Sequence, residues 1–346
     1  MIVGISNTIS GEKISLVYDE VKEYLLANKE AFVTDYLPKE KLRFDKGKPV
    51  VFFYKTVTEQ RVERIKIEFS FDSSFSIIER EESFFSGNDL VIYNLKTNCH
   101  YYFRITLILK DGNKIMEKGE FETVNSPRMI NLDGACNVRD IGAWKTESGK
   151  IIKQGLLYRG SEIDGVTNKG HPDFCLTSLG IRQSRQLGIK TDFDLRSSNV
   201  KSSEYSILGS DVIHSFYNAV QYQAVTDSNN VKKVKEIFSA LANPSIYPVY
   251  LHCTHGVDRA GTIVLLLEGL LGVSKADIIR DYELSAYYYN FSHVNRNFQN
   301  SGNILSLIKK LEQYSGETFA DNVASFLLST GVTQTEINNI RTFFLD

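Results

Sequence analysis

Residues 42–125 alternate apolar and polar side chains with a period of two. Five short runs rich in Val, Ile, Phe, Tyr and Thr carry this pattern: VVFFYKTV, RIKIEFSF, DLVIYNL, YYFRITLIL and KGEFETV. Turn signals such as Asp111-Gly112-Asn113 separate the runs. Several short strands at this spacing are typical of a β-sandwich, so the sequence predicts a small all-β sandwich domain over residues 42–125.

The segment before this domain follows the helical period instead. Between Tyr18 and Tyr36 the apolar side chains recur at roughly helical spacing, and no Gly or Pro interrupts them. We therefore expect a helix there, within an N-terminal helical segment over residues 1–41. Such a helix either acts as a docking arm or packs on the next domain.

Strand and helix patterns alternate beyond the linker Asn125-Ser126-Pro127. TDFDL and YPVYLHC have the apolar character of buried strands, and three longer runs have that of helices: TIVLLLEGLLGV, KADIIRDYELSAYYY and NILSLIKKLEQY. Alternation of this kind predicts an α/β domain over residues 126–346, with a mainly parallel central sheet flanked by helices.

Composition narrows the classes of protein that fit. The 346 residues carry 40 Lys+Arg and 42 Asp+Glu, a net charge of −2, which argues against a dedicated nucleic-acid binder. Neither a signal peptide nor an apolar run of the roughly 20 residues that a membrane span needs is seen. Four scattered cysteines suit a reduced protein, so we expect a cytoplasmic location.

The chemistry is concentrated in VYLHCTHGVDRAGT, residues 249–262. A predicted strand ends at His252, and five residues separate Cys253 from Arg259 at the start of a helix. The N–H groups of so short a loop can converge on one anion at a helix N-terminus, where the helix dipole adds positive potential. The Arg259 guanidinium would grip two phosphate oxygens, and the same field would favour the Cys253 thiolate.

The other residues of this segment would complete the anion site. Gly256 permits a backbone conformation that a Cβ would oppose, and His252 is expected to donate a hydrogen bond that holds the loop. The remaining candidates for substrate binding here are Thr254, His255, Val257 and Ala260.

This segment has the Cys-x5-Arg signature of protein tyrosine phosphatases, in the fuller form His-Cys-x-x-Gly-x-x-Arg-x-Gly. The chain resembles a bacterial branch of that family in further motifs: Asn137, Arg139, Asp140 and Gly142; Leu157, Tyr158, Arg159 and Gly160; Asp194, Leu195 and Arg196. The resemblance covers about residues 127–345. It is to the tyrosine-protein phosphatase family that includes secreted bacterial tyrosine and lipid phosphatases.

A general acid must protonate the leaving oxygen. In the resembled branch an Asp inside the loop has this role, which here is Asp258, and Asp194 is the competing choice. Asp194 and Arg196 otherwise form a structural pair that braces the site. Arg139, Asp140 and Arg159 either contact substrate and position the loop, or belong to a scaffold of salt bridges.

Two departures from the family pattern change the expected activity. Ala260 stands where the family usually has a Ser or Thr whose hydroxyl assists breakdown of the phosphocysteine, and Thr262 lies two residues further on. We therefore expect slow dephosphorylation. Val257 stands where lipid-active relatives often have Lys, which makes phosphoinositide activity less expected; His255 is the one candidate to replace that charge in part.

The β domain carries a weaker resemblance. LKTNCHYYFRI, from Leu95, is similar to the fibronectin type III pattern Leu-x-Pro-x-Thr-x-Tyr, although Thr97 and Cys99 replace the Pro and Thr. In that fold the Tyr, here Tyr101, forms a corner whose hydroxyl bonds nearby backbone. Such a domain would serve as a spacer or bind a protein partner.

These observations favour a cysteine-dependent phosphomonoesterase that acts on phosphotyrosine in proteins or on a small phosphomonoester. It would need no metal or organic cofactor, no nucleic acid and no membrane span. One alternative is an inositol-phosphate or phosphoinositide phosphatase, with basic groups drawn from Arg139, Arg159, Arg196 and Lys201. Another is a slow or degenerate phosphatase that serves as a phosphate-binding module, as Ala260 suggests.

Overall fold

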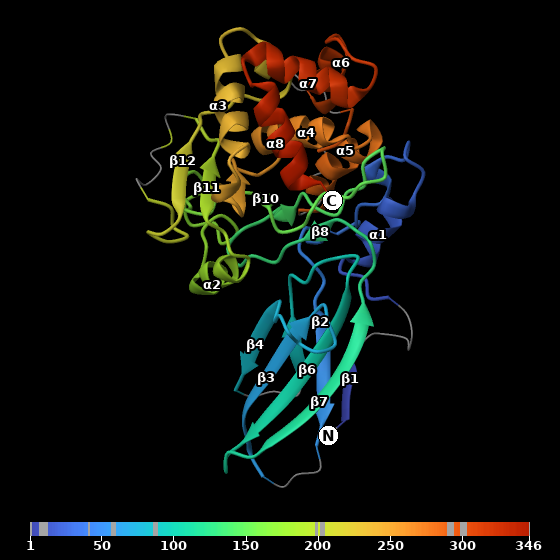
Figure 1. The fold of residues 1–346 in the computed structure, drawn as a ribbon, viewed down its shortest axis with the longest axis vertical. Coiled ribbons are helices and arrows are strands. Elements are labelled where there is room, and N and C mark those ends of the chain that lie inside the picture. The colour runs from blue at the N-terminus through green and yellow to red at the C-terminus, as the bar shows by residue number, and fades with distance from the viewer. Residues whose placement is uncertain are drawn as a thin grey trace. The chain divides into compact units, whose positions relative to one another are not determined.

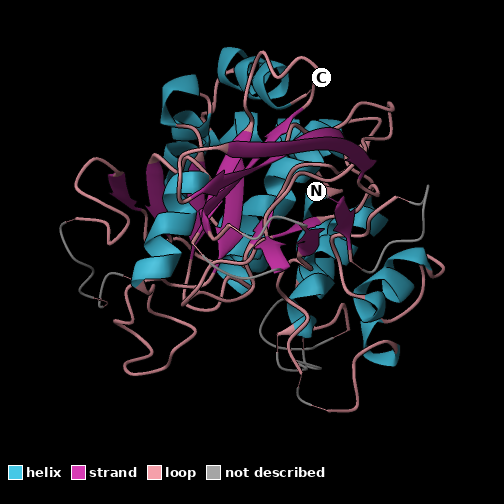
Figure 2. Ribbon diagram, turned by 90° about the horizontal axis from the view of Figure 1, so that it is seen from below, coloured by secondary structure: helices cyan, strands magenta, loops and turns pink. Residues whose placement is uncertain are grey.

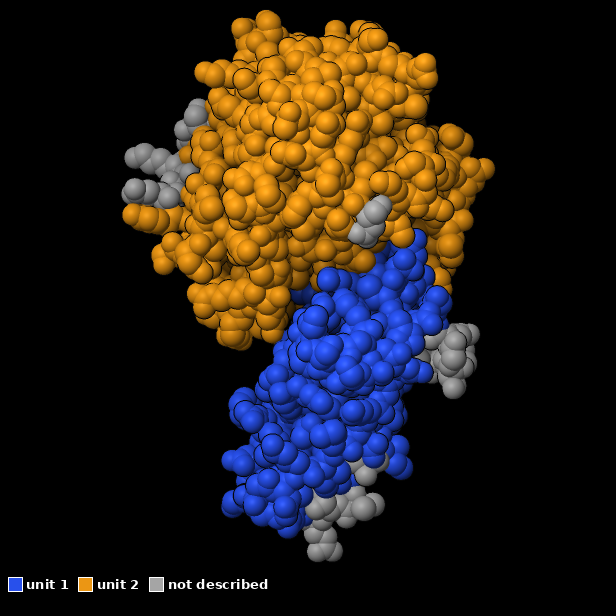
Figure 3. All heavy atoms as spheres, in the orientation of Figure 1, with its two compact units in different colours: residues 1–16, 47–126 blue, residues 17–46, 127–346 orange. Residues whose placement is uncertain are grey.

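The chain forms two compact units (Figures 1 and 3). The β unit comprises residues 1–16 and 47–126, and the α/β unit comprises residues 17–46 and 127–346. This computed structural model describes residues 2–6, 13–40, 42–56, 60–85, 89–197, 200, 205–288, 294–297 and 303–345.

This division differs from the expected one at the N-terminus. Residues 1–41 do not form a segment of their own, because residues 1–16 join the β unit and residues 17–46 join the α/β unit. The reason is burial: Val21 and Tyr24 are fully buried in the main core of the α/β unit. The second boundary, between residues 126 and 127, falls in the expected linker.

The β unit contains two antiparallel sheets. One has the order β1-β2-β5, formed by Ile2–Ile5, Val50–Lys55 and Asp89–Ile92. The other has the order β4-β3-β6-β7, formed by Arg80–Phe84, Val62–Ser70, His100–Leu109 and Lys114–Glu122. Phe52 of the first sheet contacts Phe69 and Phe103 of the second, so both sheets share one core.

The hydroxyl of Tyr101 accepts a hydrogen bond from the Lys96 N–H at 2.8 Å. This is the kind of contact that the fibronectin type III resemblance implies for that tyrosine. The resemblance itself stays a prediction, because a hydroxyl bonded to nearby backbone is a local feature.

The α/β unit is built on a six-stranded sheet of order β12-β11-β13-β10-β9-β8. Four strands run parallel: β12 (Ile213–Phe216), β11 (Thr191–Asp194), β13 (Val249–His252) and β10 (Leu157–Gly160). Two short strands, β9 (Arg139–Asp140) and β8 (Arg128–Met129), are antiparallel. The sheet is therefore mainly parallel, as expected. Its central strand, β13, is buried along its whole length.

Helices pack around this sheet (Figure 2). They are α2 (Ser178–Gln186), α3 (Val231–Leu241), α4 (Asp258–Leu271), α5 (Lys275–Glu283), α6 (Ile304–Leu311), α7 (Phe319–Thr330) and α8 (Gln334–Phe344). Three 3-10 turns connect them: η2 (Tyr222–Thr226), η3 (Pro244–Ile246) and η4 (Leu284–Tyr287). Among the described residues, no helix combines the length and the apolarity that crossing a bilayer requires.

The helix expected over residues 18–36 is shorter than predicted. It is α1 (Asp19–Leu26), and a separate 3-10 turn, η1, follows at Val33–Asp35. Ala27 is extended, and the Asn28 side chain accepts a hydrogen bond from the Glu30 N–H, which favours a turn over a further helical turn. The segment packs as a helix on its unit: the Tyr24 hydroxyl donates to Glu283.

Candidate active site

The Cys253–Arg259 loop begins at the carboxyl end of β13 and leads into α4. The registers of the parallel strands place His252 opposite both Gly160 of β10 and Asp194 of β11, so the ends of three strands meet at this loop. Cys253 is 3% exposed. The loop lies where an open α/β sheet ordinarily binds its ligands, at the carboxyl edge.

Four consecutive carbonyl groups of the loop accept hydrogen bonds from the surrounding unit. The Glu162 N–H donates to the Thr254 carbonyl at 3.0 Å, and the Asn137 side-chain amide donates to that of His255 at 3.2 Å. Arg159 donates to the carbonyls of Gly256, at 2.8 Å, and Val257, at 3.2 Å.

The N–H groups of the loop consequently face the other way. Across a trans peptide the C=O and the next N–H point in opposite directions. Among the described residues, the N–H groups of Gly256 and Val257 have no hydrogen-bond partner. N–H groups of this kind beside a helix N-terminus, here that of α4, are suited to bind an anion.

Position 256 requires glycine both because of its backbone conformation and because its surroundings leave no space for a Cβ. Its φ is +72°, a left-handed conformation that favours glycine, and a Cβ built on it would lie 2.4 Å from the carbonyl carbon of Gly160. The loop can approach the end of β10 only because this side chain is absent.

Arg259 spans the mouth of the loop. Its Nη2 donates to the Thr254 hydroxyl at 3.2 Å, and its Nη1 lies 3.5 Å from the carbonyl oxygen of Leu195, just after β11. The side chain is half-buried. A planar guanidinium held in this way is suited to bind two oxygens of one phosphate.

Two buried arginines share one carboxylate behind the loop. Asp281 of α5 accepts from Arg159 Nη1 at 2.6 Å and from Arg139 Nε at 2.9 Å. Burial and the neighbouring charge of Arg139 lower the pKa of Arg159 to about 10, against the attraction of Asp281. The contacts of Arg159 thus go to the loop backbone and to Asp281.

Asn137 and Asp45 continue this support. The Asn137 side-chain oxygen accepts from Arg139 at 2.6 Å, and its backbone N–H donates to Asp45 at 2.7 Å. Asp45 belongs to residues 17–46, the early segment of this unit. Asp45, which is far from the Cys-x5-Arg signature in the sequence, thus supports Asn137, whose side-chain amide binds the His255 carbonyl.

Asp140 is placed differently from the other candidates. It is fully buried, and it accepts hydrogen bonds from Arg128, at 2.9 Å, and from the N–H groups of Gly142, at 2.8 Å, and Gly155, at 2.6 Å. Burial raises its pKa above the usual range, although Arg128 opposes the shift. These contacts fold the 140–155 region and lead away from the loop.

Asp194 and Arg196 belong to a buried ion cluster. Arg196 donates to Asp194 at 2.7 Å, to Glu162 at 2.6 Å and to Asp164 at 2.6 Å. Burial by itself would raise the pKa of Asp194, but the charges of His252 and Arg196 and the hydrogen bonds from Arg196 hold it below its ordinary value. Asp194 is therefore a bonded, ionised carboxylate.

His252 is held from both sides of its ring. Its Nδ1 lies 3.3 Å from the Cys253 carbonyl oxygen, and its Nε2 lies 3.0 Å from Asp192. Burial would lower the pKa of His252, but the charge and the hydrogen bond of Asp192 outweigh it, and the pKa is raised.

Asp258 is the first residue of α4 and is half-buried. Its Oδ1 accepts from the Tyr222 hydroxyl. Thr262 donates its hydroxyl proton to the Asp258 carbonyl at 2.8 Å and accepts from the Tyr222 N–H at 2.9 Å. The Thr262 hydroxyl is thus already engaged, and Ala260 between them is fully buried.

The remaining loop candidates differ in exposure. Val257 is 5% exposed and packs in the core, whereas His255 is exposed and its ring contacts Phe174, with 5.4 Å between the ring centroids. Lys201 lies outside the described residues.

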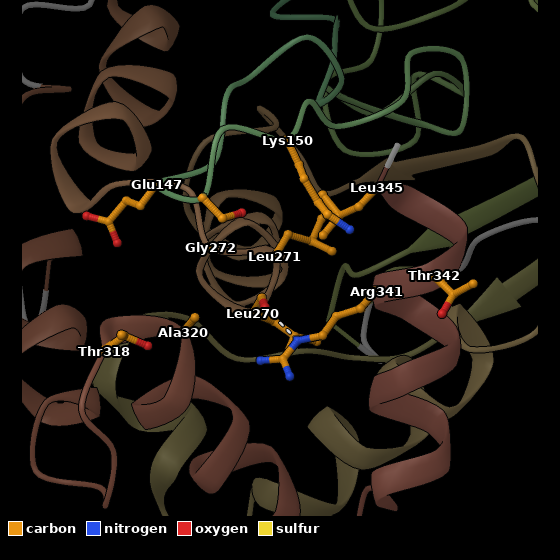
Figure 4. A pocket seen from close by; sticks show the side chains of 11 residues that line it. Glu147, Lys150, Leu270, Leu271, Gly272, Thr318, Ala320, Arg341, Thr342 and Leu345 are labelled. Atoms are coloured by element: carbon orange, nitrogen blue, oxygen red, sulfur yellow. Dashed lines mark hydrogen bonds between the residues drawn. The ribbon is translucent and has the colours of Figure 1, made fainter.

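A separate cavity of about 540 Å³ lies at the other end of α4 (Figure 4). Leu270, Gly272 and Arg341 line it, and Arg341 donates to the Leu270 carbonyl at 3.2 Å. None of the Cys253–Arg259 loop residues belongs to this lining.

Several residues of the site were not found from the sequence. Asp281 lies 142 positions after Arg139 in a segment that shows only a helical pattern, and Tyr222 and Asp45 precede the loop without any motif. The one available signal was indirect: buried arginines require a carboxylate partner, which leaves several acidic residues to choose from.

Comparison with known proteins identifies the family of the chain. The family model "Tyrosine phosphatase family" matches residues 130–346, more than half of the chain. The chain belongs to this family. A tyrosine-protein phosphatase of Nostoc commune is 29% identical over 129 residues, 30% of this chain and 42% of the relative. A provisionally named tyrosine-protein phosphatase of Cupriavidus necator is 24% identical over 178 residues, 44% of this chain and 61% of the relative.

The chain thus spans about half the length of these curated relatives. Its family and the names of both relatives support a phosphatase hydrolase. All described residues of the loop and of its supports fall in the matched region except Asp45.

Proposed function

We propose that the protein is a cysteine-dependent phosphomonoesterase that hydrolyses phosphotyrosine in proteins. One observation carries the proposal. The carbonyl groups of residues 254–257 accept hydrogen bonds from behind the loop, so the N–H groups that follow them face the other side, where a phosphate would sit between Cys253 and Arg259. Preorganised donors of this kind stabilise the charge that develops in phosphoryl transfer.

The reaction takes two steps. The Cys253 thiolate attacks phosphorus; the S–P bond forms as the bond from phosphorus to the leaving oxygen breaks, and Asp258 gives that oxygen its proton. Water then attacks the phosphocysteine, losing a proton to Asp258, and the S–P bond breaks to release phosphate and the thiolate. Arg259 and the loop N–H groups bind the phosphoryl oxygens in both steps.

Asp258 is preferred over Asp194 as the acid. Both oxygens of Asp194 accept hydrogen bonds from Arg196, and the pKa of Asp194 is lowered. Asp258 accepts one hydrogen bond, at Oδ1, and among the described residues its Oδ2 has no hydrogen-bond partner. Oδ2 is thus available to carry the transferable proton.

The phosphoinositide alternative is less well supported. Arg139, Arg159 and Arg196 are buried and paired with carboxylates, which leaves them poorly placed to bind additional phosphates. The phosphate-binding module keeps one supporting observation: the Thr262 hydroxyl, the nearest substitute for the one missing at Ala260, donates to the Asp258 carbonyl.

The deciding experiment is phosphate release from p-nitrophenyl phosphate, with a chelator present, by the native chain and by Cys253→Ser. We expect turnover that the variant loses. Equal turnover by both proteins would refute the cysteine mechanism. Phosphotyrosine and phosphoserine peptides of one sequence then test the substrate class, and a preference for phosphoserine would refute it.

A further inference from the structure

Tyr222 is attached to α4 at two points. Its backbone N–H donates to the Thr262 hydroxyl at 2.9 Å, and its own hydroxyl donates to Asp258 Oδ1. Tyr222 is 8% exposed, and η2, which starts at this residue, lies in the sequence between β12 and α3. The first turn of α4 and this tyrosine therefore form one hydrogen-bonded assembly.

The direction of the protons follows from the contacts. Burial, together with the charges of Tyr282 and Asp258, raises the pKa of Tyr222, so the phenol stays protonated. Its single proton goes to the Asp258 carboxylate. The Tyr282 hydroxyl, 3.2 Å away, must then donate to the Tyr222 oxygen. The result is a chain from Tyr282 through Tyr222 to Asp258.

The backbone conformation of Tyr222 also indicates that its surroundings fix this residue in place. The φ of Tyr222 is +52°, a conformation that is uncommon for a bulky side chain and persists only where the surroundings impose it. Tyr282 is adjacent to Asp281 on α5, so one helix supports both the arginines behind the loop and the tyrosine at its acid.

We propose that Tyr222 is a positioning residue for Asp258, binding Oδ1 so that Oδ2 presents its proton to the leaving oxygen. This rests on the proposed function, in which Asp258 is the general acid. Tyr282 supports the same geometry by donating to Tyr222. This role differs from a purely structural one, because it predicts that the activity lost on removing the Tyr222 hydroxyl depends on the leaving group.

Tyr222→Phe tests the proposal with two substrates. p-Nitrophenol leaves readily without a proton, whereas phenol needs one. Because kcat/KM reports the first step even when breakdown of the phosphocysteine limits kcat, we expect kcat/KM for phenyl phosphate to fall about 10–100-fold and kcat/KM for p-nitrophenyl phosphate to fall less than about 3-fold. Tyr282→Phe keeps the Tyr222 contact and is expected to give a smaller loss of the same selectivity.

Tyr247→Phe is the matched control. Tyr247 is also buried, and its hydroxyl donates to the Leu241 carbonyl at 2.5 Å, a contact that does not involve the loop. We expect its kcat/KM to be unchanged for both substrates. Equal losses of kcat/KM for the two substrates in Tyr222→Phe would overturn the proposal, as would no loss. If circular dichroism shows that Tyr222→Phe is unfolded, Tyr282→Phe decides by the same criterion.

Two further variants separate this failure from that of the proposed function. Cys253→Ser must abolish turnover, and Asp258→Asn must lower kcat/KM for phenyl phosphate more than for p-nitrophenyl phosphate. If either expectation fails, or if the native chain has no turnover, the proposed function is refuted, and the proposed role of Tyr222 is refuted as well. If both hold and Tyr222→Phe is unselective, only the role of Tyr222 is refuted.

Discussion

Arg159 and Asp281 form an ion pair of 2.6 Å in which both side chains are 1% exposed. A second nitrogen of the same guanidinium, Nη2, donates a hydrogen bond to the carbonyl of Gly256 at 2.8 Å. The orientation of the Cys253–Arg259 loop thus depends on a carboxylate in α5, far along the chain from the signature residues.

Asp281→Asn should destabilise the whole unit. The substitution leaves two buried arginines without their shared negative charge, and breaking a buried pair in this way costs about 3–5 kcal/mol. Urea denaturation measures the change in unfolding free energy. Asp277→Asn on the same helix is the control, because Asp277 pairs with the exposed Lys29 and should cost about 1 kcal/mol or less. Equal costs for the two variants would contradict the prediction.

Gly256→Ala should abolish the site through a collision as well as through backbone strain. The new Cβ would meet the Gly160 carbonyl carbon at 2.4 Å and displace the loop. We expect kcat/KM for p-nitrophenyl phosphate to fall about 100-fold or more, since small displacements at a reacting centre have effects of that size. Gly170→Ala shares the positive φ, +76°, but meets nothing within 4 Å, so it should keep its activity. A similar loss in both variants would mean that the collision is unimportant.

Ala260→Ser should speed the second step. A hydroxyl at this position would help water to attack the phosphocysteine, and we expect the steady-state rate to rise about 10-fold while the burst changes little. Rapid mixing with p-nitrophenyl phosphate measures both rates. Ala260→Cys, of similar size, should not reproduce the gain. A native chain whose burst and steady-state rates are equal would show that this step is not limiting.

The His252–Asp192 pair should stabilise the fold at acidic rather than alkaline pH. The pKa of His252 is raised in the folded chain, so its contribution is fully present below the unfolded pKa of about 6.5 and is lost as the pH rises through the folded value. Asp192→Asn should therefore lower the unfolding free energy more at pH 6 than at pH 9. Chemical denaturation at the two pH values checks this, and an equal loss at both would contradict it.

The sequence predicts elements well where one local property decides them. Alternation is sufficient for β2, β3, β5, β6 and β7, because more buried and less buried side chains alternate along most of their length. It misses β4, whose residues Arg80–Phe84 are mostly charged and lie at the edge of the sheet, where polar side chains are favoured. It misses β1 because Ile2–Ile5 reads IVGI, in which apolar and polar side chains do not alternate.

The residues of the candidate site likewise divide into those that the sequence predicts and those that it does not. The loop is predicted because its residues are contiguous and have the fixed spacing that binding one phosphate would impose. The residues that support the loop are not contiguous in the sequence. Asp281, the partner of Arg139, is 142 positions away from it, and 36 positions separate Tyr222 from Asp258. Ion pairs and hydrogen bonds between distant segments leave no periodic trace, so only the folded chain reveals them.

The assignment of residues 17–46 to the α/β unit has a consequence for biosynthesis. As the chain emerges from the ribosome, α1 and Asp45 appear before residues 47–126, and their partners Glu283 and Asn137 follow only after those residues have been made. Those intervening residues hold all strands of the β unit except β1. The β unit can therefore fold co-translationally while Val21 and Tyr24 still lack their core, and the α/β unit reaches its native state last.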